Sequence, residues 1–101
     1  MEVRRASRAI FGNRHKLEVC AAIARGDRLF YVQGLSDATG IPTPTIRPII
    51  AAMLHVLLRE TPQIGSPTAR RYIERLDHPF WEAVAALHQS VAGSADLTRA
   101  N

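Results

Sequence analysis

The sequence predicts a mainly helical domain that carries one small β-hairpin, and three observations lead to this fold class. Apolar residues recur at helical spacing in several segments of the 101-residue chain. Two short stretches with the character of β-strands, LLRET and ARRYIERL, flank the turn-rich sequence PQIGSPT. A chain of this length has room for one hydrophobic core, and therefore for one domain.

The first part of the chain is predicted to form two helices separated by a glycine. Residues 7–11 form a short helix that stops at Gly12. The arginines within residues 1–13 resemble a basic arm, for which an ordinary solvated N-terminus is the alternative. Asn13 is the expected N-cap of a second helix over residues 14–25. The buried face of that helix is formed by residues at helical spacing: Leu17, Cys20, Ala21 and Ala24.

The middle of the chain is predicted to contain a short strand, two helices and a sharp turn between them. The β-prone run LFYV, residues 29–32, has the length of one edge strand. Residues 33–39 form a helix of two turns, and Gly40 supplies the left-handed backbone that a sharp turn requires. The next helix has a clear core face, made by Ile46, Ile49, Ile50, Met53 and Leu57.

The start of this next helix is complicated by three prolines: Pro42, Pro44 and Pro48. The first N–H groups of a helix have no partner within it, so a proline there costs no hydrogen bond. If Thr45 is the N-cap, Pro48 falls in that first turn, whereas a cap at Thr43 places Pro48 where one bond is lost. A late start is therefore expected, after an irregular or 3₁₀ lead-in.

The last part of the chain is predicted to form the hairpin and a terminal helix. The hairpin spans about residues 58–76 and has a loop longer than a tight turn. Within residues 77–91 a helix begins at Pro79, which is well placed in a first turn. Residues 92–101 form a flexible tail.

This order of elements resembles the winged helix-turn-helix of bacterial transcriptional regulators of the ArsR/MarR type. FGNRHKLEVCAAIAR resembles the first scaffold helix of that family, and LSDATGIPTPTIRPIIAAMLHVLLR resembles its helix-turn-helix. The resemblance implies a DNA-binding core over residues 14–76, with a recognition helix over about 43–57 and a wing over about 58–76. Two departures stand out: Leu57 occupies the place of a customary glycine, and the exposed face of the recognition helix carries one full cation, Arg47.

The net charge fits a polyanionic partner, and the resemblance implies that this partner is double-stranded DNA. Thirteen Lys and Arg residues against nine Asp and Glu residues give a net charge of +4, which favours a polyanion. Arg47 is the best candidate for reading a base, because arginine pairs with guanine O6 and N7. Strand alternation directs one of Arg70 and Arg71 toward DNA and leaves the other to pair with Glu60 or Glu74. The expected DNA-binding residues are Arg14, Lys16, Thr43, Thr45, Arg47, Arg70 and Arg71.

The terminal helix has a broader apolar surface than one small core needs. Phe80 and Trp81 are adjacent and therefore point about 100° apart around a helix. One alternative is that Phe80 and Leu87 close the core of the monomer. The other, which we favour, is a two-fold interface in a homodimer. The residues expected there are Phe80, Trp81, Val84, Leu87, His88 and Val91.

Several other classes of protein are disfavoured. The single cysteine, Cys20, excludes an intrachain disulfide, fits a cytoplasmic protein and lies on a buried helix face. The histidines are scattered, so no metal site, cofactor or catalytic constellation is expected, and His78 is expected to cap or pack. No apolar run approaches the roughly 18 residues of a membrane span.

Two possibilities stay open beside a DNA-binding regulator. One is a small-molecule effector bound at a dimer interface. The other is a winged-helix module for protein–protein interaction that has lost base readout, which the prolines and alanines of the recognition helix favour.

Overall fold

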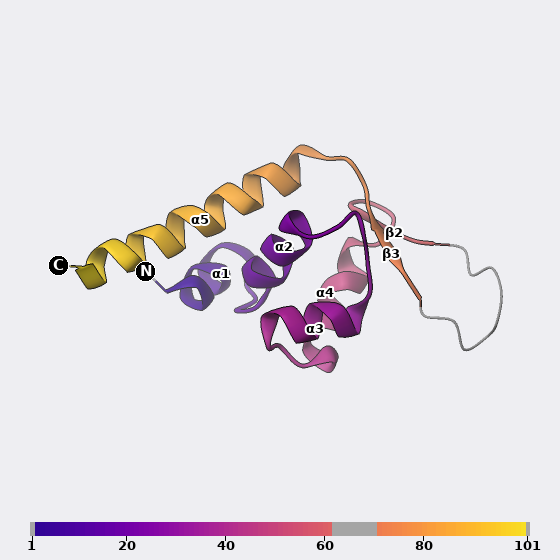
Figure 1. The fold of residues 1–101 in the computed structure, drawn as a ribbon, viewed down its shortest axis with the longest axis horizontal. Coiled ribbons are helices and arrows are strands. Elements are labelled where there is room, and N and C mark those ends of the chain that lie inside the picture. The colour runs from indigo at the N-terminus through magenta and orange to yellow at the C-terminus, as the bar shows by residue number, and fades with distance from the viewer. Residues whose placement is uncertain (1, 62–70, 101) are drawn as a thin grey trace.

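The computed structural model describes residues 2–61 and 71–100, which form a mainly helical chain with a small antiparallel sheet (Figure 1). No helix in this part of the chain has the length and apolar character that a bilayer span requires. The described residues form five helices and three strands: α1 (Val3–Phe11), α2 (Lys16–Arg25), β1 (Leu29–Phe30), α3 (Val32–Thr39), α4 (Thr43–Met53), β2 (Leu58–Glu60), β3 (Ile73–Arg75) and α5 (Pro79–Ala100).

α2 is the central helix of the core. It contacts α5 most extensively and also packs against α1, α3 and α4. Figure 1 shows α5 running along one side of α2, α3 and α4 on the other side of α2, and the hairpin toward the end of the molecule away from the C-terminus. The core is one continuous cluster, and its burial from water is the main stabilising contribution. Its most deeply buried members on α2 are Leu17, Val19, Cys20 and Ile23.

The sheet has the strand order β1-β3-β2, and both strand pairs are antiparallel. The predicted edge strand and hairpin are therefore confirmed, but with shorter strands. β1 ends at Phe30 and not at residue 32, where α3 begins, and β3 is shorter than the run ARRYIERL suggests. The side chain of Glu74 forms an ion pair with Arg59 on the neighbouring strand. Most of the predicted wing loop, including Arg70, lies outside the described residues.

α1 is longer than predicted and packs on the body of the molecule. It begins at Val3, so the arginines that were expected in a basic arm belong to a helix. Arg4 Nε lies 3.4 Å from Glu18 Oε1 of α2, which ties the two helices together. The predicted stop is confirmed, because Gly12 adopts a left-handed φ of 72° and its N–H bonds to the Arg8 carbonyl.

Ser7 joins α1 to the first turn of α2. Its side chain is fully buried, and its Oγ accepts a hydrogen bond from the Leu17 N–H at 2.9 Å and donates one to the Asn13 carbonyl. The prediction that Asn13 caps a helix from residue 14 is wrong, because His15 is the N-cap residue. Asn13 Oδ1 instead accepts the His15 N–H at 2.9 Å. The Ser7 hydroxyl of α1 thus accepts the N–H of Leu17, which has no acceptor within α2.

α4 begins earlier than predicted. The carbonyl of Pro42 accepts hydrogen bonds from the N–H groups of Thr45 and Ile46, at 3.0 and 3.2 Å. These bonds make Pro42 the N-cap and put Pro44 in the first turn, where its missing N–H costs nothing. The predicted late start at Thr45 is wrong.

Pro48 consequently lies inside α4, where it removes one helix hydrogen bond. A proline in a helix interior costs about 3 kcal/mol. Burial of a large apolar side chain contributes about 1.5–3 kcal/mol, and α4 buries four of them: Ile46, Ile49, Ile50 and Met53. Core burial therefore outweighs the lost bond, and the helix continues through the proline.

α4 ends at Met53, short of the predicted end near residue 57. The turn that follows contains His55 in the left-handed conformation, with φ of 73°. Its N–H bonds to the carbonyl of Leu58 at 2.8 Å, which brings the chain directly into β2. A residue with a Cβ pays roughly 1–2 kcal/mol for this backbone conformation.

α5 extends to Ala100, so most of the segment predicted as a tail, residues 92–100, belongs to this helix. Its beginning matches the prediction: Pro79 is the first residue, and His78 Nδ1 accepts the N–H of Phe80 at 3.0 Å. The predicted capping role of His78 is confirmed. Figure 1 shows the C-terminal part of α5 running on past α1.

Candidate nucleic-acid interface

α4 and the hairpin border a groove of about 620 Å³, which we call the α4–hairpin groove. Apolar side chains line part of it, including Ile50, Leu54 and Ile73. Charged side chains from both borders also line it: Arg47 from α4, Glu60 from β2, and Arg71 from the segment before β3. The remaining lining residues are Tyr31, Val32, Gln33, Ala51, Thr61 and Tyr72.

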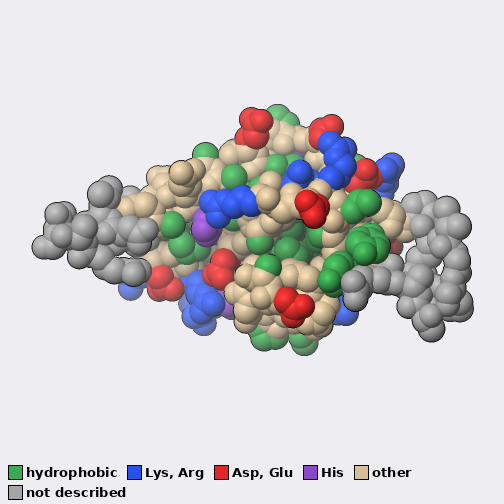
Figure 2. Space-filling model, viewed as in Figure 1, with side chains coloured by type: hydrophobic (Ala, Val, Ile, Leu, Met, Phe, Trp, Pro, Cys, Tyr) green, Lys and Arg blue, Asp and Glu red, His purple; other side chains and the backbone are tan. Residues whose placement is uncertain are grey.

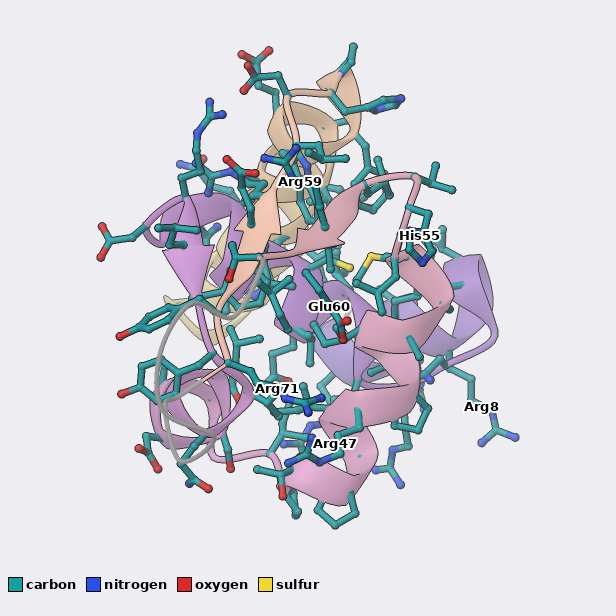
Figure 3. The ribbon with its side chains drawn as sticks, turned by 90° about the vertical axis from the view of Figure 1, so that its right-hand side faces the viewer. Arg8, Arg47, His55, Arg59, Glu60 and Arg71 are labelled. Carbon is teal, nitrogen blue, oxygen red and sulfur yellow. The ribbon has the colours of Figure 1, made fainter. Side chains whose placement is uncertain are left out.

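Arg47 reaches the groove because of the helical period of α4. Ile46, Ile49 and Ile50 face the core, so the two residues between Ile46 and Ile49, Arg47 and Pro48, face outward. The Arg47 side chain is exposed. Figure 3 shows it on the side of α4 that faces the hairpin, with the ends of Arg47 and Arg71 next to one another.

The position of Arg71 is set by the hairpin. Thr61 donates two hydrogen bonds to the carbonyl of Tyr72, from its N–H at 3.1 Å and from its Oγ1 at 2.9 Å. These bonds continue the ladder between the strands beyond the paired residues of β2 and β3. Side chains alternate along a strand, so Arg71 lies on the same face as the buried Ile73. The side chain of Arg71 is therefore directed along the groove.

The electrostatic character of the groove differs from that of the paired arginines Arg28 and Arg59. Neither Arg47 nor Arg71 has a hydrogen bond or ion pair within the described residues, and the same is true of Glu60 there. The guanidinium groups of Arg47 and Arg71 outweigh the Glu60 carboxylate in the same groove, so the net charge of its lining is positive. Such a pair of guanidinium groups suits an anion that can accept several hydrogen bonds, such as a phosphate group.

Elsewhere on the surface, positive and negative groups are mixed. On the face shown in Figure 2, Lys and Arg side chains are interspersed with Asp and Glu. Arg28 Nη2 lies 2.7 Å from Asp77 Oδ1, and Arg59 is paired with Glu74. These arginines are largely neutralised by neighbours on the chain, which leaves less of their charge for an external anion.

Two tyrosines line the groove beside the arginines, and sequence reasoning did not single them out. The rings of Tyr31 and Tyr72 meet edge to face, with centroids 5.7 Å apart. Tyr31 is the N-cap residue of α3, and Tyr72 immediately precedes β3. The alternation of ARRYIERL places Tyr72 on the face opposite Arg71, so its proximity to the groove could not be read from the strand pattern.

Four of the predicted DNA-binding residues do not line the groove. Arg14 is exposed in the connection between α1 and α2. Lys16 Nζ lies 5.6 Å from the centre of the Phe11 ring, a cation–π contact with α1. Thr43 and Thr45 are partly buried in the first turn of α4. Of the predicted set, the structure brings Arg47 and Arg71 together, and Arg70 lies outside the described residues.

The predicted dimer interface on α5 needs correction. Trp81 and Val84 are 6% and 2% exposed and belong to the core of the single chain. The indole Nε1 of Trp81 donates a hydrogen bond to the Leu76 carbonyl at 2.9 Å, and its ring meets that of Phe80 edge to face. Because these two residues are already buried, they are not available to a second copy.

The other residues of that prediction are partly buried against the same core: Phe80, Leu87 and Val91. His88 is also partly buried, and its pKa is lowered by burial and by Arg25, with Glu18 of α2 acting in the opposite sense. The broad apolar surface of α5 is thus used mainly within the chain, against α2. The outward-facing residues between the first turn and residue 90 are small or polar: Glu82, Ala83, Ala86, Gln89 and Ser90.

Cys20 is a core residue, as predicted. Its Sγ lies 3.7 Å from the Sδ of Met53, and burial raises the pKa of the thiol to about 11, with Lys16 acting weakly in the opposite sense. The thiol therefore stays protonated at neutral pH. Across residues 2–61 and 71–100, no group of three or more His, Cys, Asp and Glu side chains is placed to hold a metal ion.

Comparison with known proteins does not assign a family. A scan against protein-family models and searches of curated proteins and solved structures found no match to this chain. The function is therefore argued from the residues of the α4–hairpin groove.

Proposed function

We propose that the chain is a winged-helix DNA-binding protein, a transcriptional regulator that acts as a homodimer in the cytoplasm. α3 and α4 serve as the helix-turn-helix, α4 as the recognition helix, and β2 and β3 as the base of the wing. The observation that carries the proposal is the placement of Arg47 and Arg71 in one groove, each without a partner among the described residues.

The two arginines take different roles in this proposal. α4 enters the major groove, where its exposed side faces the base edges, and Arg47 contacts guanine O6 and N7. Arg71 lies on the hairpin and contacts the sugar–phosphate backbone beside that groove. Contacts to the sugar–phosphate backbone fix the register of the protein on the duplex, whereas contacts to base edges select the sequence.

The N-terminus of α4 contributes little to phosphate binding. Pro44 has no N–H group, and the N–H of Thr45 is already bonded to the Pro42 carbonyl. The free N–H groups that make many helix N-termini good anion sites are therefore largely missing here. Affinity for DNA rests on side-chain cations, and above all on Arg47 and Arg71.

The end of α5 supports the homodimer part of the proposal. Figure 1 shows its last turns beyond α1, at the opposite end of the molecule from the hairpin. A second copy that packs there would leave both α4–hairpin grooves uncovered. Two-fold symmetry would then direct two recognition helices at the half-sites of a pseudo-palindromic duplex.

Equilibrium binding to duplex DNA tests the proposal. The probe is a labelled duplex enriched from a pool with a random centre, and the variants are the wild type and the double variant Arg47→Ala/Arg71→Ala. Because charge-assisted hydrogen bonds contribute about 1.5–3 kcal/mol each, we expect the affinity of the double variant to fall roughly 100-fold or more. Thermal unfolding confirms that both proteins are folded.

The matched control is Arg5→Ala/Arg8→Ala, which removes the same charge from exposed positions on α1. Figure 3 shows Arg8 pointing away from the groove. We expect this control to retain wild-type affinity within about threefold, since it loses only the long-range attraction of two screened charges. An equal loss in both double variants, or no duplex binding by the wild type at low salt, would contradict the proposal.

One observation favours a second candidate function, a module for protein–protein interaction. The groove combines the apolar side chains of Ile50, Leu54 and Ile73 with charged groups of both signs, a composition that also suits a peptide segment. A wild-type protein that is folded and dimeric but binds no duplex at low salt would favour this module over the regulator.

A further inference from the structure

We infer that α4 selects sites in which a guanine has thymine as a close neighbour, with Arg47 contacting the guanine and the methyl group of Ala51 contacting the thymine methyl. This inference rests on the proposed function and specifies which bases the groove reads. It follows from the composition of the exposed face of α4, from the chemical groups that the bases present in the major groove, and from the spacing of Arg47 and Ala51.

The exposed face of α4 offers one hydrogen-bonding side chain. Ile46, Ile49, Ile50 and Met53 are buried, which leaves the opposite side of the helix for a partner. From the first turn to the end of the helix, the exposed residues are Pro44, Arg47, Pro48, Ala51 and Ala52. Apart from the guanidinium group, this surface presents methyl and methylene groups.

A surface of this kind discriminates among bases by matching apolar groups. In the major groove, the thymine C5 methyl is the apolar group that a base edge presents, whereas adenine and cytosine present amino donors and guanine presents acceptors. An alanine against one of those polar groups would exclude water without replacing its hydrogen bonds, which is unfavourable. An alanine against thymine incurs less of this penalty and gains a methyl–methyl contact.

Ala51 is the alanine placed to make this contact. Arg47 and Ala51 both line the α4–hairpin groove, whereas the equally exposed Ala52 does not. Residues four apart on a helix are separated by about 6 Å along its axis, and successive base pairs are about 3.4 Å apart. If α4 follows the major groove, the guanine and the thymine are therefore within about two base pairs of each other.

Substitution of deoxyuridine for thymidine tests the contact, because it removes the methyl group and leaves base pairing intact. Each thymine of the enriched duplex is replaced singly, and affinity is measured for the wild type. We expect one replacement within about two base pairs of a guanine to weaken binding about fourfold, the value for one buried methyl group. The other replacements are expected to have little effect.

Two variants of α4 locate the protein side of the contact. Ala51→Gly removes the alanine methyl and should abolish the preference for thymine over uracil at the sensitive position. Ala52→Gly carries the same intrinsic helix cost and should keep the preference. The ratio of the two affinities is measured within each variant, so a general loss of stability does not affect it.

Each outcome has a distinct meaning. Salt-dependent duplex binding by the wild type, without any sensitive thymine, would overturn this inference and leave the proposed function standing. A preference that persists in Ala51→Gly, or disappears equally in Ala52→Gly, would overturn the assignment to Ala51. Absence of duplex binding by the wild type would overturn the proposed function and this inference with it.

Discussion

Polar groups are arranged differently in two regions of the molecule. One is the side built on α2 and α5, and the other is the α4–hairpin groove. At the α2–α5 side, the Leu17 N–H donates to Ser7 Oγ and the indole N–H of Trp81 donates to the Leu76 carbonyl. The buried Nδ1 atoms of His15 and His88 are exceptions, since neither has a hydrogen-bond partner among the described residues. In the groove, Arg47 and Arg71 have no such partners among the described residues. The Leu17 and Trp81 donors of the scaffold are thus bonded within the chain. The groove instead keeps charge available for a molecule outside the chain.

Two arginines close together in the chain show this contrast most directly. Arg75 ends β3 and Arg71 lies four positions earlier, before the strand, so alternation directs both to the same side of the hairpin. Arg75 Nη1 donates hydrogen bonds to the carbonyls of Ile23, Ala24 and Gly26, at 2.6, 3.0 and 3.0 Å. It thus caps the C-terminal end of α2, where carbonyls lack helix partners and a positive charge is favoured.

The largest expected effect is on the scaffold side. Trp81→Ala should lower the free energy of unfolding by about 3–5 kcal/mol, because it leaves a cavity in the core and removes the bond to the Leu76 carbonyl. Denaturant unfolding measures this. Trp81→Phe, which keeps most of the ring, should cost clearly less. A cost below about 1 kcal/mol for Trp81→Ala would contradict the burial of this residue within the single chain.

The next effect contrasts the two arginines of the hairpin. Arg75→Ala should lower the free energy of unfolding by about 1.5–3 kcal/mol, because carbonyls at the end of α2 lose a charged donor. Arg71→Ala should change it by no more than about 0.5 kcal/mol, since its side chain is exposed and unpaired within the described residues.

The second measurement on the same two variants is duplex affinity, for which we expect the larger loss in Arg71→Ala. Arg71→Ala should weaken binding, and Arg75→Ala should leave the affinity of the folded protein nearly unchanged. If Arg71→Ala and Arg75→Ala lose stability to the same extent, the contrast between a hydrogen-bonded Arg75 and an unpaired Arg71 is wrong.

A smaller loss is expected at the junction of α1 and α2. Ser7→Ala should cost about 1–3 kcal/mol, because it leaves the buried N–H of Leu17 without an acceptor. The matched control is Ser90→Ala, at an exposed position of α5, which should change stability by less than about 0.5 kcal/mol. Equal effects in the two serine variants would show that the Ser7 hydroxyl does not cap α2.

The smallest effect is a gain in stability beside the groove. His55→Gly should raise the free energy of unfolding by roughly 0.5–1 kcal/mol, because glycine adopts a positive φ without strain while adding entropy to the unfolded chain. His55→Ala is the control, since alanine keeps the Cβ that causes the strain and should bring no gain. A loss of stability in His55→Gly would indicate that the imidazole makes a stabilising contact.

Local sequence signals predicted the order of the elements and several of their ends. Gly12 and Gly40 both have the left-handed backbone expected of helix-ending glycines, with φ of 72° and 74°. The core faces of α2 and α4 follow the apolar spacing, apart from Leu57, which lies beyond the end of α4. The start of α4 could not be predicted in this way, because the cost of Pro48 had to be compared with core burial that depends on the whole fold.

Only part of the candidate site could be predicted, because the site too depends on the whole fold. Helical spacing placed Arg47 outward, and strand alternation placed Arg71 on one face of the hairpin. Whether two elements meet is a tertiary property, so Arg14 and Lys16 were included although neither lines the groove. The buried position of Trp81 likewise depends on how α5 crosses α2, and nothing in the local pattern around residues 80 and 81 determines that crossing.

The most direct test of the central claim is the salt dependence of duplex binding by the wild type and by Arg71→Ala. The logarithm of the association constant is plotted against the logarithm of salt concentration for the same enriched duplex. We expect a steep negative slope for the wild type and a slope shallower by about 0.9 for Arg71→Ala, the value for one lost phosphate contact. Identical slopes, or a wild-type affinity that does not change with salt, would contradict a groove whose arginine binds the DNA backbone.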